Sequence, residues 1–357
     1  MFATAIRRVN TRLEASTRSK KLLPLEVGET VIIKRMNWGE RYRGSDLWIE
    51  DVKGNHFVAA GLTIGTKNNL SPLVDFKKIW ALANFAGLKI GLIDTGVMQD
   101  PLLFKEQVHQ INHGNSDITD PHGTYMASII AGNDYKNGYA GFIPNSTIYS
   151  FKASWWNDNL PDRTVYQDFC EGLNRLLALD VDIVNISMGT YKHKAFFERD
   201  TRVKHLLDQF TQKGVPIIAA TGNDSYRTDD LKFYPAGQPG MFSVSGYSTT
   251  NASVDFDSGL NLWSDVTLLC PSFQIFDADF FIKYGTNKTV GSSVAAAVAT
   301  GTVGVLKLLH LKNGGGIPFI DSVQETVQSM PSILAEGGNL RNRKFRYLDF
   351  NLITTKI

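Results

Sequence analysis

The chain has 357 residues, of which 43% are hydrophobic, so it is long enough to bury one large core and a second, smaller one. Its 37 basic and 35 acidic residues leave a net charge of +2, and this near-neutral balance gives no sign of a nucleic-acid partner. Cys170 and Cys270 are too few for a disulfide framework. We expect two buried free thiols, with a single bridge as the alternative.

The first 21 residues predict a flexible basic tail. They carry one acid, Glu14, and six basic residues: Arg7, Arg8, Arg12, Arg18, Lys20 and Lys21. They lack the apolar stretch of a secretion signal, although an organelle-targeting peptide remains an alternative. No window approaches the apolar length that crosses a bilayer. We therefore expect a cytoplasmic protein without a membrane partner.

Residues 22–65 predict a small all-β domain. Short β-rich runs at residues 31–34, 47–52 and 56–60 are separated by turn-forming residues. Their spacing around Trp48 resembles bacterial SH3-like domains, which implies a five-stranded barrel. Such domains bind peptides or cell-wall glycan, so the resemblance implies docking of a regulator or a substrate. A purely structural role is the alternative.

Short apolar runs alternate with helical stretches after a linker at residues 66–69. The apolar runs predict buried strands at residues 88–93, 147–151, 183–187, 215–220 and 241–244. Helical periodicity appears at residues 74–85, 124–131, 164–179 and 195–213. This alternation indicates a doubly wound α/β domain over residues 70–350, with a mostly parallel sheet whose ligands bind at the carboxyl ends of the strands.

Two short strings supply an acid and a base. The first is Asp94-Thr95-Gly96, in which Asp94 ends an apolar strand and needs a donor or a charged partner to stay buried. The second begins with His122, which opens an apolar helix. Alone, Asp94 would be interpreted as a turn residue, and a histidine at a helix start is unremarkable.

Two further strings supply a hydroxyl and an amide. Ser293 lies at the start of a long helix of small residues, where the positive potential of the helix end favours developing negative charge. The alternative is an ordinary alanine-rich helix capped by Ser292. The apolar run at residues 217–220 leads to Gly222 and Asn223, whose side-chain amide is able to donate to an oxyanion.

The order acid, base, hydroxyl resembles the subtilisin-like serine proteases, or subtilases. Residues 79–80, 138–144 and 184–189 match further landmarks of that family, so the resemblance covers residues 70–350. It implies that Asp94, His122 and Ser293 form a catalytic triad and that Asn223 is the oxyanion donor. It also implies that six residues contact the substrate around the cleaved bond: Ser187, Met188, Gly189, Ala220, Thr221 and Gly222.

Several positions depart from the family pattern. The chain has Ala296-Ala297-Val298 where Ser-Pro-His is usual, Tyr125 where His is frequent, and Pro121 in place of a glycine. Phe233 stands where the family often has a small residue, so we expect a shortened pocket that favours a small residue before the cleaved bond.

No organic cofactor is implied by these motifs. Calcium is common in the family, but the loop with Asp224, Asp229 and Asp230 is interpreted as solvated, and no metal site is assigned. Residues 22–25 weakly resemble the inhibitory extension of intracellular subtilisins, which lies across the active site.

The sequence therefore predicts an intracellular serine endopeptidase that acts on protein or peptide substrates. One alternative is a transpeptidase or macrocyclase, in which an amine replaces water in the second step. The other is a non-catalytic peptide-binding pseudoprotease.

Overall fold

A mixed sheet of eight strands forms the centre of the catalytic region. The computed structural model describes residues 2–5, 7–42, 45–65, 67–81, 84–154, 162–191, 197, 199–250, 253–286, 290–335 and 340–357. The strand order is β12-β11-β10-β9-β6-β8-β7, and β13 also pairs with β11. All pairs are parallel except β11 with β12. The strands are β6 (Lys89–Asp94), β7 (Val108–Gln110), β8 (Thr147–Lys152), β9 (Ile183–Ile186), β10 (Ile217–Ala220), β11 (Phe242–Thr250), β12 (Ser253–Phe256) and β13 (Leu268–Pro271).

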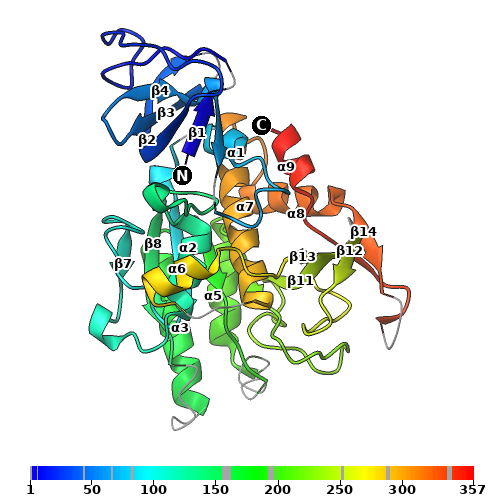
Figure 1. Cartoon of the computed structure of the whole chain (residues 1–357). Helices are drawn as coiled ribbons and strands as arrows, with labels where there is room; N and C mark the ends of the chain where they lie inside the picture. The colour runs from blue at the N-terminus through cyan, green and yellow to red at the C-terminus, as the bar shows by residue number, and fades with distance from the viewer. Residues whose placement is uncertain are drawn as a thin grey trace.

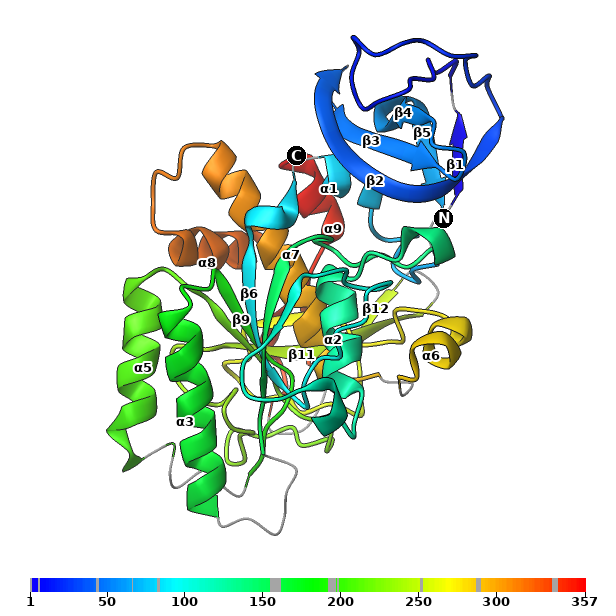
Figure 2. The ribbon, with the colours of Figure 1, turned by 90° about the vertical axis from the view of Figure 1, so that its left-hand side faces the viewer.

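Helices cover both faces of this sheet, as the doubly wound prediction requires. Helices α3 and α5 lie on one face, and α2 and α7 lie on the other (Figure 2). Helices α2 and α7 also pack against each other. The helices are α1 (Phe76–Ala81), α2 (His122–Ala131), α3 (Asp162–Ala178), α5 (Thr201–Gln212), α6 (Ala278–Tyr284), α7 (Ser292–Lys312), α8 (Phe319–Ser329) and α9 (Phe350–Thr355). Strands β14 (Ser332–Leu334) and β15 (Lys344–Arg346) form a separate antiparallel pair.

Helix α7 is the central helix of the core. Sixteen of its residues are buried, including the run from Ser292 to Leu306. It is long and apolar enough to cross a membrane by length and composition, so the prediction that no segment reaches that length is wrong. However, 78% of its most apolar window is buried inside the molecule, which is the position of a core helix. Cys170 in α3 and Cys270 in β13 are buried free thiols, as predicted.

A five-stranded antiparallel sheet forms the N-terminal domain, which agrees with the predicted all-β character but begins before the predicted range of residues 22–65. Its strand order is β4-β3-β2-β1-β5. The strands are β1 (Phe2–Ala5), β2 (Thr30–Tyr42), β3 (Ser45–Asp51), β4 (His56–Val58) and β5 (Leu62–Gly65).

The expected flexible tail over residues 1–21 does not hold in the structure. Strand β1 (Phe2–Ala5) lies between β2 and β5 and pairs with both. Its Ala3 and Ala5 face the core, because alternation along a strand buries every second side chain. Leu25 pairs with Val9 in the same domain, so the segment 22–25 does not lie across the predicted active site.

The N-terminal domain lies at the amino-terminal edge of the catalytic sheet (Figure 1). Trp38 of β2 contacts the edge of Phe85, which precedes β6 by a few residues, with ring centroids 6.3 Å apart. Lys67, which follows the last strand of the N-terminal domain, donates its backbone amide to the carbonyl of Gly138. Its side chain forms ion pairs with Asp277 and Asp279. The expected linker is therefore fixed to the catalytic domain at Lys67.

A buried carboxylate with two partly exposed cations stabilises the N-terminal sheet. Glu50 of β3 is 4% exposed at its side chain and accepts hydrogen bonds from Lys34, Arg35 and Asn37. Burial alone would raise the pKa of Glu50, but these hydrogen bonds outweigh it and lower the pKa from 4.5 to about 2. The carboxylate therefore stabilises the fold above pH 4.5, and this stabilisation is lost as the pH falls towards 2.

We expect Glu50→Gln to lower the free energy of unfolding by about 2 kcal/mol at pH 7, because Lys34 and Arg35 lose their charged acceptor. The deficit should shrink as the pH falls from 4.5 to 2. Urea unfolding of the full chain, followed by tryptophan fluorescence, measures both. Glu171→Gln is the control, since Glu171 is half-exposed in its ion pair with Arg175 and should cost less than about 0.5 kcal/mol. Equal deficits in the two variants would contradict the prediction.

Candidate active site

Three neighbouring parallel strands end at one edge of the sheet and bring the predicted site residues there. Asp94 is the last residue of β6, Ser187 follows β9, and Asn223 lies just beyond β10. These strands are adjacent in the order β10-β9-β6, so their carboxyl ends meet. Helices α2 and α7 begin with His122 and Ser292 and pack together on the same face.

Asp94 is a buried carboxylate with two donors on one oxygen. It is 1% exposed, and its Oδ1 accepts from the backbone amide of Thr95 at 2.7 Å and from Nδ1 of His122 at 2.7 Å. Its Oδ2 has no hydrogen-bond partner among the described residues. Because Asp94 is an acceptor, Nδ1 of His122 carries the proton, and Nε2 of the neutral ring is left as an acceptor.

His122 is held by backbone contacts as well as by Asp94. Its own amide donates to Oδ1 of Asp120 at 2.9 Å, and the Thr95 hydroxyl accepts from the amide of Gly123 at 2.9 Å. A Cβ atom on Gly123 would lie 2.5 Å from the carbonyl oxygen of Gly96, so the close approach of the two loops requires glycine there. The loops that carry the acid and the base are thus fixed to each other.

The charge of Asp94 controls the pKa of His122. Burial lowers the pKa of the imidazole, but the Asp94 carboxylate, and Asp120 more weakly, outweigh burial and raise the pKa above its ordinary value of 6.5. The imidazolium form is therefore favoured at low pH, and a neutral ring able to accept a proton is present above the raised pKa.

Ser293 contacts Ser187 through two hydrogen bonds. The Ser293 hydroxyl donates to the carbonyl oxygen of Ser187 at 2.9 Å, and the Ser187 hydroxyl donates to the carbonyl oxygen of Ser293 at 3.1 Å. Among the described residues, no hydrogen bond joins the Ser293 hydroxyl to His122. The structure therefore places Asp94 and His122 in direct contact, and it places Ser293, at the start of α7, against Ser187 at the end of the neighbouring strand.

Asn223 is tied to the start of α7 through its carbonyl oxygen. Oδ1 accepts from the backbone amide of Ser292 at 2.9 Å and from its hydroxyl at 3.0 Å. The same hydroxyl accepts from the amide of Gly222 at 3.0 Å. The amide nitrogen of Asn223 has no hydrogen-bond partner among the described residues and is left as a donor. Gly291, not Ser292, is the N-cap of α7, so the alternative of a simple serine cap is not supported.

The aromatic ring of Phe233 fills the space between the two predicted pocket walls. A Cβ atom built on Gly189 would lie 2.4 Å from this ring, and one built on Gly222 would lie 3.0 Å from it. Tyr191 packs edge-on against Phe233, with centroids 5.1 Å apart. The gap between residues 187–189 and 220–222 is therefore short.

The loop considered for calcium is occupied by hydrogen bonds instead. Asp224 accepts from the hydroxyl of Tyr191 at 2.9 Å, and Asp229 accepts from the amide of Ser264 at 2.7 Å. Asn261 bonds both the Tyr191 hydroxyl and the Asp224 amide. Within the described ranges, no group of three or more His, Cys, Asp or Glu side chains is arranged to hold a metal ion.

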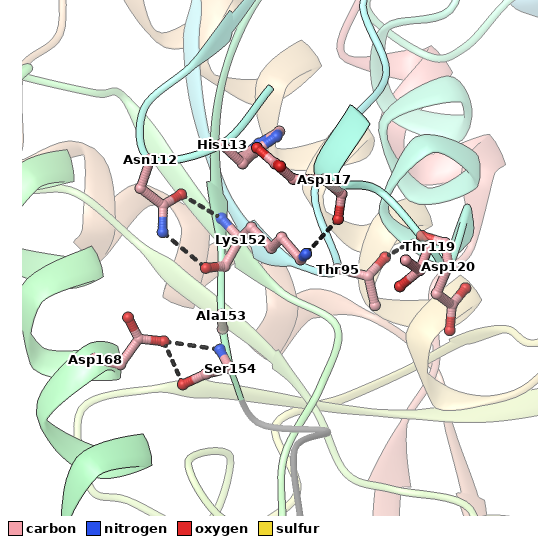
Figure 3. Close-up of a pocket in the computed structure, with 10 residues that line it drawn as sticks. All are labelled: Thr95, Asn112, His113, Asp117, Thr119, Asp120, Lys152, Ala153, Ser154 and Asp168. Carbon is pink, nitrogen blue, oxygen red and sulfur yellow. Dashed lines mark hydrogen bonds between the residues drawn. The ribbon is translucent and has the colours of Figure 1, made fainter. Parts of the chain in front are cut away.

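A polar cavity of about 670 Å³ is lined by residues from the loops that follow β6 and β8 and precede α2 (Figure 3). It is lined by Thr95, the neighbour of Asp94, and by Asp120, which contacts His122. Lys152 reaches across it to the carbonyl of Asp117, and Asp168 accepts from Ser154 on the other side. A ligand in this cavity would therefore contact Thr95 and Asp120, which adjoin the loops of the acid and the base.

Three residues of the site were not found from the sequence. Thr95 joins the two loops, Ser292 links Asn223 to Gly222, and Asn261 supports the strand end at Thr221. Thr95 and Ser292 are neighbours of predicted site residues, which is a usable signal. Asn261 has no local motif, because it contacts Thr221 from 40 residues away.

We expect Asp94→Asn to lower the pKa of His122 below 6.5, because burial remains while the negative charge is lost. NMR titration of the imidazole protons measures this shift. Asp120→Asn is the control and should lower the same pKa by less. If the Asp94→Asn variant still cleaves peptides, this cleavage should be lost at a lower pH than in the unmodified chain, because His122 is protonated at a lower pH. A pKa that stays raised would show that Asp94 does not set it.

Comparison with known proteins assigns the chain to a family. Residues 86–345 match the model of the Subtilase family. The chain is 25% identical over 236 residues to the "Major intracellular serine protease" of Bacillus subtilis (strain 168), covering 62% of this chain and 68% of that protein. It is 27% identical over 233 residues to the "Subtilisin-like protease SBT6.1" of Arabidopsis thaliana, covering 62% of this chain but only 21% of that protein.

The fold agrees with this assignment. The structure of the prenylagaramide maturation protease PagA superposes with a TM-score of 0.61 at 19% identity, over 79% of this chain and 98% of that one. At this identity the likeness shows the shared fold alone. Because the family model matches well over half of the residues, the chain belongs to the subtilase family of serine peptidases.

Proposed function

We propose that the chain is an intracellular serine endopeptidase in which Asp94, His122 and Ser293 form the catalytic triad. The observation that carries the proposal is the buried hydrogen bond of 2.7 Å between Asp94 Oδ1 and His122 Nδ1. It fixes the tautomer that leaves Nε2 able to accept a proton, which is the state that a general base needs. Family membership supports the same assignment.

Ser293 is the proposed nucleophile. It is the second residue of α7, whose positive end stabilises an alkoxide or an oxyanion. In the proposed reaction, its hydroxyl turns from the Ser187 carbonyl towards the imidazole, loses its proton to Nε2 and attacks the scissile carbonyl. His122 then delivers that proton to the leaving amine, and water hydrolyses the acyl-enzyme.

Asn223 is the proposed oxyanion donor. Its Oδ1 is engaged by Ser292, so its amide nitrogen is left to donate, and the backbone amide of Ser293 supplies the second donor. Such a donor contributes to catalysis because it is fixed before the reaction and needs no reorganisation. Loss of one oxyanion donor costs roughly 10²–10³ in kcat.

The strand ends on both sides of Ser293 are the proposed substrate contacts. Residues 187–189 would pair with the substrate backbone as an added strand, and residues 220–222 would line the opposite side of the pocket. The ring of Phe233 lies close to both Gly189 and Gly222, which supports a preference for a small residue before the cleaved bond.

The remaining finer assignments are also proposals. The N-terminal sheet is proposed to be an SH3-like barrel that docks a regulator or a substrate, since it lies at the sheet edge opposite the site (Figure 1). The intracellular location is supported by the similarity to the Bacillus subtilis enzyme. No organic cofactor, metal ion, membrane or nucleic acid enters the proposed reaction.

We expect Ser293→Ala to abolish both peptide cleavage and labelling by a fluorophosphonate probe, because the attacking oxygen is lost. Ser292→Ala is the control: it should still be labelled to completion, since its hydroxyl is not the nucleophile. Full labelling of Ser293→Ala would contradict the assignment, and so would an unlabelled wild type, which would favour the pseudoprotease. Mass spectrometry of the products in the presence of an added amine separates hydrolysis from transpeptidation or macrocyclisation.

We expect the unmodified protein to cleave after Gly, Ala or Ser and to reject Phe and Tyr at that position, because Phe233 occupies the space. Phe233→Ala should raise kcat/KM for a Phe substrate about tenfold or more. A peptide library read by mass spectrometry measures both profiles. Tyr191→Phe is the control, since it keeps the ring contact and should leave the profile unchanged. Efficient cleavage after Phe by the unmodified protein would refute this role.

A further inference from the structure

A closed ring of hydrogen bonds joins strand β9 to helix α7 behind Ser293. Asn185 of β9 donates its amide to the hydroxyl of Thr300 at 2.9 Å and accepts from the hydroxyl of Ser187 at 2.9 Å. The single hydroxyl proton of Ser187 is shared between Asn185 and the carbonyl of Ser293, at 3.1 Å, and the carbonyl of Ser187 accepts from the hydroxyl of Ser293. Thr300 and Ser293 lie on the same helix, two turns apart, so the helix completes the ring.

The spacing of these residues explains why the ring closes. Residues 185 and 187 are two apart, so their side chains point to the same face of the sheet. Residues 293 and 300 are seven apart, so they share one stripe of an α-helix. Helix α7 packs on β9, so Asn185 and Ser187 face Ser293 and Thr300.

Every polar atom of the Asn185 side chain is used by this ring. Asn185 and Thr300 are each 0% exposed, and a buried amide without partners would be costly. Thr300 also donates to the carbonyl of Ala296 at 2.9 Å, so its hydroxyl both donates and accepts. Because they are fully buried, these two side chains do not contact a substrate.

We propose that Asn185 and Thr300 are positioning residues, which hold Ser187 and through it fix the backbone and the hydroxyl of Ser293. This inference rests on the proposed role of Ser293 as nucleophile. The carbonyl of Ser187 holds the hydroxyl of Ser293 in its resting orientation, and the hydroxyl of Ser187 donates to the backbone carbonyl of Ser293. Any displacement of Ser187 therefore displaces the attacking oxygen.

The chain offers a matched pair of threonines for the test. Thr300 and Thr302 are both buried in α7, and each donates its hydroxyl to the carbonyl four residues earlier, at 2.9 Å. Only Thr300 also accepts from Asn185. Thr300→Val and Thr302→Val therefore lose the same helix hydrogen bond, and they differ in whether the link to Asn185 is cut.

Fluorophosphonate labelling of the full chain measures the effect, because it needs no known substrate. We expect Thr300→Val to lower the maximal labelling rate roughly five- to tenfold, the loss of one buried hydrogen bond, without changing the half-saturating probe concentration. Thr302→Val should stay within about twofold of the unmodified chain, and Thr300→Ser, which retains the hydroxyl, should restore the rate. The pH midpoint of labelling should be the same in all variants, because His122 is untouched.

Equal labelling rates for Thr300→Val and Thr302→Val would overturn the inference, provided that both variants are folded by circular dichroism. If Thr300→Val does not fold, Ser187→Ala cuts the same ring while keeping the backbone carbonyl, and an unchanged labelling rate in that variant would overturn it instead. Failure of the proposed function is distinguishable, since Ser293→Ala would then remain labelled.

Discussion

The burial of one carboxylate at the end of the central strand constrains the whole site. Asp94 is 1% exposed, and a charged group in that position is tolerable only when donors surround it. Two donors come from the chain that follows β6: the amide of Thr95 and, through the start of α2, the ring of His122. The strand, the turn and the first residue of the helix must therefore keep one geometry, which is the geometry that an oriented base requires.

The same edge carries a second fixed unit, which is built by α7 rather than by α2. Ser292 and Ser293 bond Asn223 and Ser187, which follow the two neighbouring strands β10 and β9. Helices α2 and α7 pack against each other, so the acid–base unit and the hydroxyl unit are joined through buried helix faces. The placement of the acid–base unit relative to the hydroxyl unit therefore depends on buried side chains and not on side chains that contact solvent. The precision of the site thus depends on the packing of the core.

The sequence predicted the buried strands of the catalytic sheet well, but it did not predict which side chains meet across long sequence separations. Apolar runs located β6, β8, β9, β10 and β11, because buried parallel strands are apolar on both faces. The N-terminal strand β1 was missed because the many basic residues after it indicated a flexible tail. Its only strand signal is the alternation of two small buried residues, Ala3 and Ala5. The bonds between Asn185 and Thr300 and between Ser187 and Ser293 were also missed. They depend on how a helix lies on a strand more than 100 residues away, and no local pattern encodes that register.

The position of the N-terminal domain limits how it can act on catalysis. Its contacts with the catalytic domain lie at α1 and Phe85, at the helical turn of residues 135–137 and at Lys67, at the edge of the sheet opposite Asp94. A direct block of the site by residues 22–25 is therefore excluded, because Leu25 is paired inside that domain. Lys67 does contact Asp277 and Asp279 at the start of α6, and α6 precedes the strand-to-helix turn that leads to Ser293. A second contact leads to the same helix, because β2 packs on residues 135–137, which follow α2, and α2 packs on α7. An influence of this domain on the nucleophile therefore has two routes among the described residues, one through α6 and one through α2.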